Sequence, residues 1–315
     1  MRLVFMGTPD FAVASFEALL RSDDSVVGIV TQPDRPKGRG QILTPSPVKL
    51  LARRERIPLL QPLKMKGPEF LQALAGWKPD LIVVAAFGRI LPPAILSLPP
   101  RGCINVHGSL LPKYRGAGPI QWAIINGERE TGITTMLMDE GMDTGAMLLQ
   151  EAIPITADDT AGTLSPRLAE LGGRLLVETI ARLKAGTLVP RPQDSSRATL
   201  APLLKKEDGA IDWALPATVL ANRVRGLSPW PGAYTIVAGG DRWAIWRALA
   251  LPGPVTKPPG VVVATTNEAI HVATGEGVLA VMELQSANSR RMAISQYLAG
   301  HPIAVGLQLG GPALS

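Results

Sequence analysis

The chain has little cysteine and no long apolar run, and each absence excludes a class of protein. Cys103 is the single cysteine among 315 residues, so no intramolecular disulfide can form and a reducing compartment is indicated. No apolar run approaches the roughly eighteen residues of a membrane helix, since a run such as 81–87 has the length of a buried strand. The apolar stretch that opens the chain is also too short for a signal peptide. We expect a cytoplasmic protein without a membrane partner.

Aromatic side chains and histidines are scarce as well. Phe, Trp and Tyr make up 4% of the chain, which disfavours base stacking along an extended single strand of nucleic acid. His271 and His301 lie far apart, and no closely spaced set of histidines and cysteines exists, so no metal site is predicted. The composition, 46% apolar and 18% charged, is typical of a globular protein, and the length predicts two domains.

The positive charge is concentrated in one part of the chain. Residues 35–66 carry nine basic side chains and one acidic one, a net +8, while the whole chain has a net charge of +6. A basic segment on a nearly neutral body indicates a polyanionic partner that is contacted at one place. The alternative is that these side chains only solvate a surface helix and loop.

Strand-like and helix-like segments alternate over the first 190 residues. Short apolar runs predict strands, and amphipathic patterns between them predict helices; the strands are at 2–7, 26–32, 81–87 and 103–107 and the helices at 11–21, 47–56 and 163–186. Gly172 and Gly173 leave open whether the last helix is continuous. Asp10 is predicted to cap the first helix. The pattern is that of an α/β, Rossmann-like domain with a mostly parallel sheet covered on both faces.

The amino-acid composition changes after this region. Residues 187–208 are rich in proline, serine and threonine, which is typical of a linker between domains. Beyond it, 232–246 has the pattern of a hairpin, and several short strands follow in 260–284. We therefore predict three parts: an α/β domain at 1–188, a linker at 189–208 and a small β-barrel at 209–315.

The strand "INVH" (104–107) carries the most informative polar residues. Asn105 and His107 are two apart, so on an extended strand they share one face, at the carboxyl end where open α/β sheets place ligands. An amide can donate a hydrogen bond to a developing oxyanion, and an imidazole exchanges a proton near neutral pH. The alternative is a structural histidine beside a turn-forming asparagine.

Two further loops carry charged residues. The loop "MDEGMDTG" (138–145) offers Asp139, Glu140 and Asp143 as partners for an imidazole or as ordinary turn residues, and the pattern does not choose among them. The glycine-spaced basic loop "DRPKGRGQ" (34–41) is suited to a phosphate backbone. The first strand–helix turn lacks the G-x-G-x-x-G pattern, which disfavours a nicotinamide oxidoreductase.

The segments "GTPDF", "TQPDRPKGRG", "SPVK", "GCINVHGSLLPKYRGAGPIQ", "ETGITTMLMDEGMDTG" and "SPWPGAY" occur in this order along nearly the full chain. In these segments the chain resembles the methionyl-tRNA formyltransferase family, part of the wider group of 10-formyltetrahydrofolate-dependent formyltransferases. The resemblance implies transfer of a formyl group from 10-formyltetrahydrofolate, a co-substrate, to the α-amine of methionyl initiator tRNA, in translation initiation and without a metal. It also implies that the second domain is an oligonucleotide-binding (OB-like) barrel.

The resemblance also implies roles for individual residues. Three groups of positions match the family's motifs: a catalytic trio, a folate-contacting segment and a loop that contacts tRNA. They are Asn105, His107 and Asp143; Ser109, Leu110, Leu111 and Pro112; and Arg35, Lys37 and Arg39, respectively.

Two other functions are compatible with parts of the pattern. An enzyme that formylates a nucleotide-linked amino sugar would share the "NVHGSLLP" run, but the basic segment favours a long polyanion as acceptor. A non-enzymatic RNA-binding relative would have no need of Asn105, His107 and Asp143. We expect a monomeric enzyme that acts on tRNA.

Overall fold

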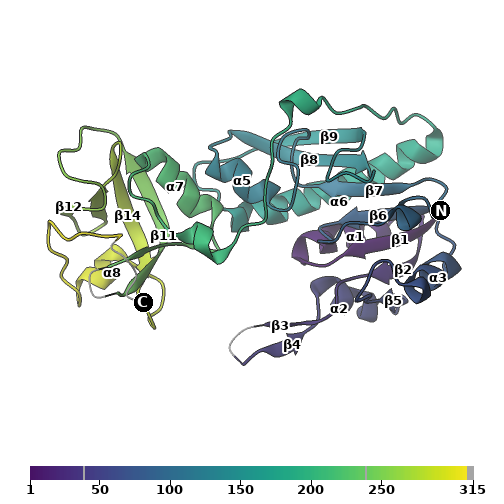
Figure 1. Ribbon diagram of the computed structural model, residues 1–315, viewed down its shortest axis with the longest axis horizontal. Helices are drawn as coiled ribbons and strands as arrows, with labels where there is room; N and C mark the ends of the chain where they lie inside the picture. Colours follow the sequence, from purple (N-terminus) through teal and green to yellow (C-terminus); the bar gives the residue numbers. More distant parts are fainter. Residues whose placement is uncertain (38–39, 238–239, 311–315) are drawn as a thin grey trace. The chain divides into compact units, whose positions relative to one another are not determined.

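The computed structural model describes residues 1–37, 40–237 and 240–310, and these form two compact units (Figure 1). The first unit contains residues 1–119, 130–154 and 165–202, and the second contains the other described residues, including 120–129 and 155–164. Most of the predicted linker, up to residue 202, therefore packs with the first unit.

The elements of the first unit follow the alternation expected from the sequence. They are β1 (Arg2–Gly7), α1 (Asp10–Leu20), β2 (Ser25–Val30), β3 (Arg35–Lys37), β4 (Ile42–Thr44), α2 (Pro47–Arg54), β5 (Leu59–Leu60), α3 (Pro68–Gly76), β6 (Leu81–Ala85), α4 (Pro93–Leu96), β7 (Cys103–His107), β8 (Glu130–Leu137), β9 (Met147–Pro154), most of α6 (Ala161–Ala185) and the short 3₁₀ turn η1 (Ser195–Arg197).

The main sheet has the order β5-β2-β1-β6-β7-β8-β9. Strands β5, β2, β1, β6 and β7 are parallel, whereas β8 and β9 are antiparallel additions at one edge. The prediction of a Rossmann-like, mostly parallel sheet is confirmed. Parallel strands with short helical crossovers place the carboxyl ends of β1, β2, β6 and β7 along one edge, which is the usual ligand edge of such a sheet.

Apolar residues on both sides of the strands explain the continuous apolar runs. In β1, Val4 and Met6 pack in a cluster with Phe70 and Leu74 of α3. Phe5 points to the other side, where its ring stacks on that of Phe16 in α1 at 5.3 Å between centroids. Each strand thus has two buried faces, which is the reason its sequence does not alternate with polar residues.

Helix α6 is continuous through its glycine pair. A Cβ on Gly172 would lie 2.9 Å from the Val106 side chain of β7, and one on Gly173 would lie 2.9 Å from the Ala14 carbonyl oxygen of α1. The two glycines therefore allow α6 to pack closely on its neighbours, a gain that outweighs their low helix propensity. The prediction for Asp10 is wrong: Pro9 is the N-cap residue, no side chain caps the helix, and Asp10 is its first residue.

The second unit is built around an antiparallel sheet. Its elements are α5 (Pro119–Ile125, all but its first residue in this unit), η2 (Lys206–Gly209), α7 (Ala217–Gly226), β10 (Ala233–Ile236), β11 (Arg242–Leu251), β12 (Val262–Thr265), β13 (Ile270–Ala273), β14 (Val278–Gln285), β15 (Met292–Ala293) and α8 (Ile294–Leu298). The strand order is β10-β11-β14-β13-β12, and β15 also pairs with β14.

The hairpin expected at 232–246 is formed by β10 and β11, which pair from Ala233 with Ile245 to Ile236 with Arg242. A core that includes Trp213, Trp243 and Tyr297 lies under this sheet, and the Trp213 indole N–H donates to the Thr235 hydroxyl at 3.0 Å. An antiparallel second domain is confirmed, and its strands are consistent with an OB-like fold. Among the described residues, no helix is both long and apolar enough to cross a membrane.

Candidate active site

Three polar side chains meet at the carboxyl end of β7. The Asn105 amide donates a hydrogen bond from Nδ2 to Oδ1 of Asp143 at 3.2 Å. His107 Nδ1 lies 3.6 Å from Oδ2 of the same carboxylate. The two β7 residues project from the same side of the strand as Cys103, which is buried in the apolar cluster under α3. On this face, β7 therefore begins with the buried Cys103 and ends with the polar side chains of Asn105 and His107.

The orientation of the His107 ring is determined by a backbone carbonyl. His107 is 5% exposed, and its Nε2 lies 2.8 Å from the carbonyl oxygen of Tyr114. Because a carbonyl can only accept, Nε2 carries a proton and donates it to this bond. The nitrogen left for chemistry is Nδ1, which faces Asp143.

Asp143 lies in the loop between the antiparallel strands β8 and β9. The loop that follows β8 starts beside the beginning of β7, where the Met138 N–H donates to the Cys103 carbonyl at 2.8 Å, and then turns back along β7. Asp143 has a φ of 55°, in the left-handed region, and its Oδ2 accepts a 2.9 Å hydrogen bond from the Gly116 N–H. The carboxylate is thus held by donors from two segments.

The other two acids of this loop have other surroundings. Asp139 accepts hydrogen bonds from the Gly141 N–H at 3.1 Å and the Thr144 hydroxyl at 2.7 Å, so it shapes the turn. Glu140 is exposed. Of the three acids that the loop offers, Asp143 is the one beside His107.

The segment Ser109–Pro112 is held from behind by a buried threonine. Thr134 in β8 donates to the Ser109 carbonyl at 2.7 Å and accepts from the Leu111 N–H at 3.1 Å. Ser109 and Leu111 are buried, and the Ser109 hydroxyl donates to the Lys113 carbonyl at 2.6 Å. In this conformation Leu110 and Pro112 are the members of the segment with partly accessible side chains.

The predicted tRNA-contacting loop forms the hairpin β3–β4. Arg35 is exposed on β3, and its guanidinium donates to the Gln32 side chain. Lys37 is the last residue of β3, paired with Ile42, and Arg39 lies outside the described residues.

A lysine that the sequence counts among the basic residues of this region has a different role. Lys49 is 6% exposed, and its Nζ donates to both oxygens of Asp34, at 2.8 and 2.7 Å. This hydrogen bond, together with one from Gln61, holds the pKa of Asp34 below its usual value. Lys49 therefore anchors the base of the hairpin and adds no free charge to it.

The residues that support the trio were not predicted from the sequence. The backbone of Tyr114 and Gly116 holds His107 and Asp143, and the side chain of Gln193 donates to the Asp143 carbonyl at 2.8 Å. Gln193 belongs to the predicted linker, 50 residues from Asp143, and has no spacing signal. Tyr114 and Gly116 could have been suspected because they lie in the segment "KYRGAG" (113–118), a few residues after "INVH".

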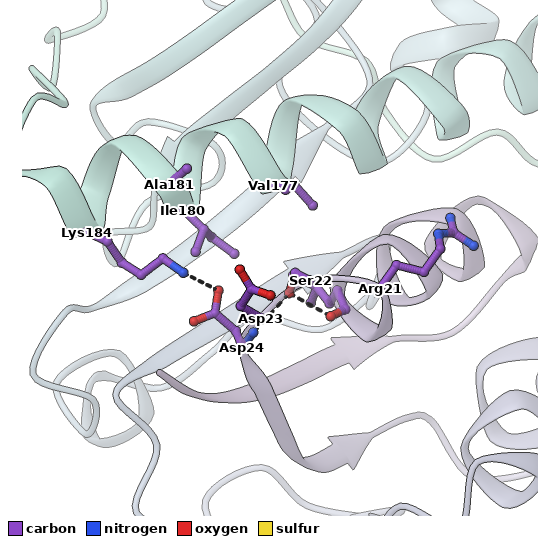
Figure 2. Close-up of a pocket in the computed structure, with 9 residues that line it drawn as sticks. Arg21, Ser22, Asp23, Asp24, Val177, Ile180, Ala181 and Lys184 are labelled. Atoms are coloured by element: carbon purple, nitrogen blue, oxygen red, sulfur yellow. Dashed lines mark hydrogen bonds and ion pairs between the residues drawn. The ribbon is translucent and has the colours of Figure 1, made fainter.

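A separate pocket of about 170 Å³ lies where the end of α1 meets α6 (Figure 2). Two contacts join groups of its lining: Lys184 Nζ donates to Asp24 Oδ2 at 3.0 Å, and the Ser22 hydroxyl donates to the Leu19 carbonyl. Burial alone would raise the pKa of Asp24, but hydrogen bonds from the Met1 amine and Lys184 lower it. Helix α1 ends at the amino edge of the parallel strands, opposite to the carboxyl edge where the trio lies.

Within residues 1–37, 40–237 and 240–310, no group of three or more His, Cys, Asp or Glu side chains is arranged to hold a metal ion. The functional groups of Asn105, His107 and Asp143 offer hydrogen bonding and proton transfer. An amide donor, an imidazole and a carboxylate in one cluster are suited to an acyl-type group transfer, in which an oxyanion forms and a nitrogen loses its proton.

The fold and this site together define a class of two-domain α/β group-transfer enzymes, and comparison with known proteins specifies it. The family model for formyl transferase matches residues 1–180, and that for the formyl transferase C-terminal domain matches residues 203–302. A methionyl-tRNA formyltransferase of Trichlorobacter lovleyi is 52% identical over 98% of this chain and 96% of its own length. One of Desulfotalea psychrophila is 52% identical over 96% of this chain and 94% of its own length. The chain therefore belongs to the formyl transferase family and, within it, to the methionyl-tRNA formyltransferases.

Solved structures share the fold at much lower identity. An N-formyltransferase from Helicobacter canadensis, in complex with folinic acid and dTDP-3-aminofucose, has a TM-score of 0.67 at 19% identity and covers 92% of this chain and 99% of its own. HypX from Aquifex aeolicus in complex with tetrahydrofolic acid has a TM-score of 0.61 at 19% identity; the match covers 97% of this chain and 48% of HypX, so this chain spans about half of that protein.

Proposed function

We propose that the protein transfers the formyl group of 10-formyltetrahydrofolate to the α-amine of methionine on initiator tRNA, giving N-formylmethionyl-tRNA for translation initiation. The observation that carries the proposal is the 52% identity over 98% of the chain to a relative of that name. The neighbour that is crystallised with an amino sugar nucleotide is 19% identical and supports the fold only.

The catalytic residues of this reaction are Asn105, His107 and Asp143. A new bond forms between the methionine nitrogen and the formyl carbon, charge develops on the formyl oxygen, and the bond from that carbon to the folate nitrogen breaks. Asn105 donates a hydrogen bond to the charged oxygen. His107 takes the proton of the attacking amine at Nδ1 and returns it to the departing nitrogen, while the Asp143 carboxylate stabilises the imidazolium.

The segment 109–112 contacts the folate co-substrate, which supplies the formyl carbon. Leu110 and Pro112 have partly accessible side chains, and Thr134 holds the segment in place through the backbone of Ser109 and Leu111. Ser109 and Leu111 are buried and act by fixing the shape of the segment. A rigid loop next to the reacting groups lowers the entropic cost of orienting the donor.

The basic hairpin with Arg35, Lys37 and Arg39 contacts the tRNA. Its glycine-spaced arginines suit phosphate oxygens, and the ion pair between the buried Lys49 and the half-buried Asp34 fixes its base. The protein acts as a monomer in the cytoplasm, with residues 1–188 as the catalytic domain, 189–208 as the linker and 209–315 as the OB-like domain.

An acceptor comparison tests the function. Purified protein with 10-formyltetrahydrofolate is offered methionyl initiator tRNA, methionyl elongator tRNA and a UDP-linked amino sugar. We expect formylation of the initiator tRNA, measured as formyl transfer to acid-precipitable tRNA. Formylation of the sugar alone would contradict tRNA as the acceptor but would still support formyl transfer as the reaction. No transfer by folded protein that binds folate would favour the RNA-binding alternative.

Replacing Arg39 with alanine should raise the KM for tRNA about tenfold or more, because a charge-assisted hydrogen bond contributes about 1.5–3 kcal/mol. The slope of log(kcat/KM) against log salt should become shallower by about 1, as expected for one lost phosphate contact. Initial rates at several tRNA and salt concentrations measure both. Arg182→Ala, which removes an exposed arginine from α6, is the matched control and should change neither quantity. Unchanged tRNA kinetics in Arg39→Ala would contradict the assignment of the hairpin.

A further inference from the structure

Residues 191–201, within the predicted linker, run alongside the two segments that hold His107 and Asp143. Met147 and Arg191 exchange backbone hydrogen bonds of 2.8 Å in both directions, so the run begins beside the first residue of β9. Ala201 then donates to the Arg115 carbonyl at 2.7 Å, and Arg115 donates to the Thr199 carbonyl at 2.9 Å. We call residues 191–201 the strap.

The Gln193 side chain of the strap joins the two segments. Its Nε2 donates to the carbonyls of Asp143 and Gly145, each at 2.8 Å. Its Oε1 accepts from Arg115 Nε at 3.0 Å and from Arg115 Nη2 at 2.8 Å. The amide orientation is unambiguous, since carbonyls only accept and a guanidinium only donates. Both donors and both acceptor sites of the amide are therefore used.

The residues that touch His107 have unusual backbone conformations. Tyr114, whose carbonyl binds Nε2, has a φ of 63°, and Asp143 has a φ of 55°. Side chains other than glycine rarely adopt this left-handed region, and such residues persist where their surroundings hold them. The strap holds both, because Thr199 Oγ1 accepts from the Tyr114 N–H at 2.9 Å and Gln193 binds the Asp143 carbonyl.

The strap also packs against Gly116, which donates a hydrogen bond to the Asp143 carboxylate. Gly116, which donates to Asp143 Oδ2, has a φ of 118°, and a Cβ there would lie 2.7 Å from the Ala201 carbonyl oxygen. The Gly118 N–H donates to that same oxygen at 3.0 Å. The loop from Tyr114 to Gly118 is thus fitted against the strap along its length.

We propose that Gln193 is a positioning residue for formyl transfer: it holds the Asp143 and Arg115 segments together so that Asp143 faces His107 Nδ1. This inference rests on the proposed function of the trio. It assigns to the predicted linker a part in the catalytic geometry, because the chain that leads into the second unit passes through the strap. A small displacement of a catalytic group lowers the rate of a reaction far more than it lowers binding.

Two substitutions of Gln193 separate its hydrogen bonds. Gln193→Met keeps the length of the side chain and removes all four bonds. Gln193→Glu keeps an acceptor for the buried Arg115 guanidinium, which protects the fold, but has no N–H for the Asp143 and Gly145 carbonyls. We expect both variants to lower kcat about 10- to 100-fold. The KM values for folate and tRNA should stay within about twofold of those of the wild type, since neither variant touches a substrate.

A control and a double-mutant cycle distinguish positioning from a general structural role. Asp194→Ala removes the neighbouring side chain, which caps the exposed turn η1 through the Ser196 N–H at 3.0 Å, and should leave kcat unchanged. In an Asp143→Ala background, Gln193→Glu should cause no further loss of kcat, because the residue through which Gln193 acts is gone.

The outcomes separate this inference from the proposed function. If the wild-type protein formylates no tRNA, the proposed function fails and the variants are not needed. If the wild type is active and folded Gln193→Glu has wild-type kcat, the positioning role of Gln193 is wrong and the function stands. An equal, independent loss in the Asp143→Ala background would also overturn the inference. Thermal unfolding, followed by circular dichroism, establishes that each variant is folded.

Discussion

His107→Ala should lower kcat for formylation of methionyl initiator tRNA by about 10²- to 10⁴-fold, the usual contribution of a positioned general acid–base. The ring is oriented by the Tyr114 carbonyl, which leaves Nδ1 to take the proton of the attacking amine. The folded state should persist, because the lost contacts lie at the end of β7 and the apolar part of the strand is unchanged. Single-turnover formylation with saturating substrates measures the effect without a contribution from binding or product release.

A histidine of the second unit provides a matched control for His107→Ala. His301 also has a ring nitrogen, Nδ1, hydrogen-bonded to a backbone carbonyl, that of Tyr297 at 3.1 Å. His301→Ala removes an equivalent side chain and should leave the single-turnover rate unchanged.

Asn105→Ala should lower the rate by about 10²- to 10³-fold, the range for one oxyanion donor. Near-normal turnover in folded His107→Ala would contradict the assigned chemistry.

Asp143→Asn should lower kcat by about 10²- to 10⁴-fold, although the side chain keeps its size. The carboxylate accepts at both oxygens, from Asn105 Nδ2 at one and from the Gly116 N–H at the other. An asparagine has one acceptor oxygen and one N–H₂ group, so one of these donors would face another donor. The neutral amide would also fail to stabilise a His107 imidazolium. Steady-state kinetics at saturating folate and tRNA measure the loss.

The same substitution in the same loop provides the comparison for Asp143→Asn. Asp139 accepts both of its hydrogen bonds, from Gly141 and Thr144, at a single oxygen, Oδ1. An asparagine can provide that oxygen, so Asp139→Asn should keep both bonds and a kcat close to that of the wild type. Equal losses in the two variants would indicate that the loop needs negative charge in general, and would remove the special role of Asp143.

Much of the fold could be predicted from local patterns. The β1, β6 and β7 runs are continuous and apolar because the sheet is covered on both faces, and this pattern is visible in the sequence itself. Asn105 and His107 are two residues apart, so their common face followed from the pleat of a strand. The hairpin of β10 and β11 followed from its turn residues in the same way. Local periodicity and chain chemistry determine each of these features.

The capping of α1 and the behaviour of α6 could not be predicted in this way. Pro9 takes the N-cap position that Asp10 was expected to hold. Gly172 and Gly173, which by propensity weaken a helix, lie where α6 meets β7 and α1 at close range. At the two glycines, contacts with distant segments outweigh a local preference of about 1 kcal/mol.

The two-domain α/β plan, the strand that carries Asn105 and His107, and the family to which the motifs belong could all be inferred from the amino-acid sequence. Which acid joins Asn105 and His107, and what holds that acid in place, became visible only in the folded chain. Asp143 lies in the loop that follows β8, a strand antiparallel to β7, and Gln193 lies in a segment 50 residues further along. Lys49, counted with the basic residues, is neutralised by Asp34. These outcomes depend on which distant segments pack together, and no local spacing or propensity encodes that.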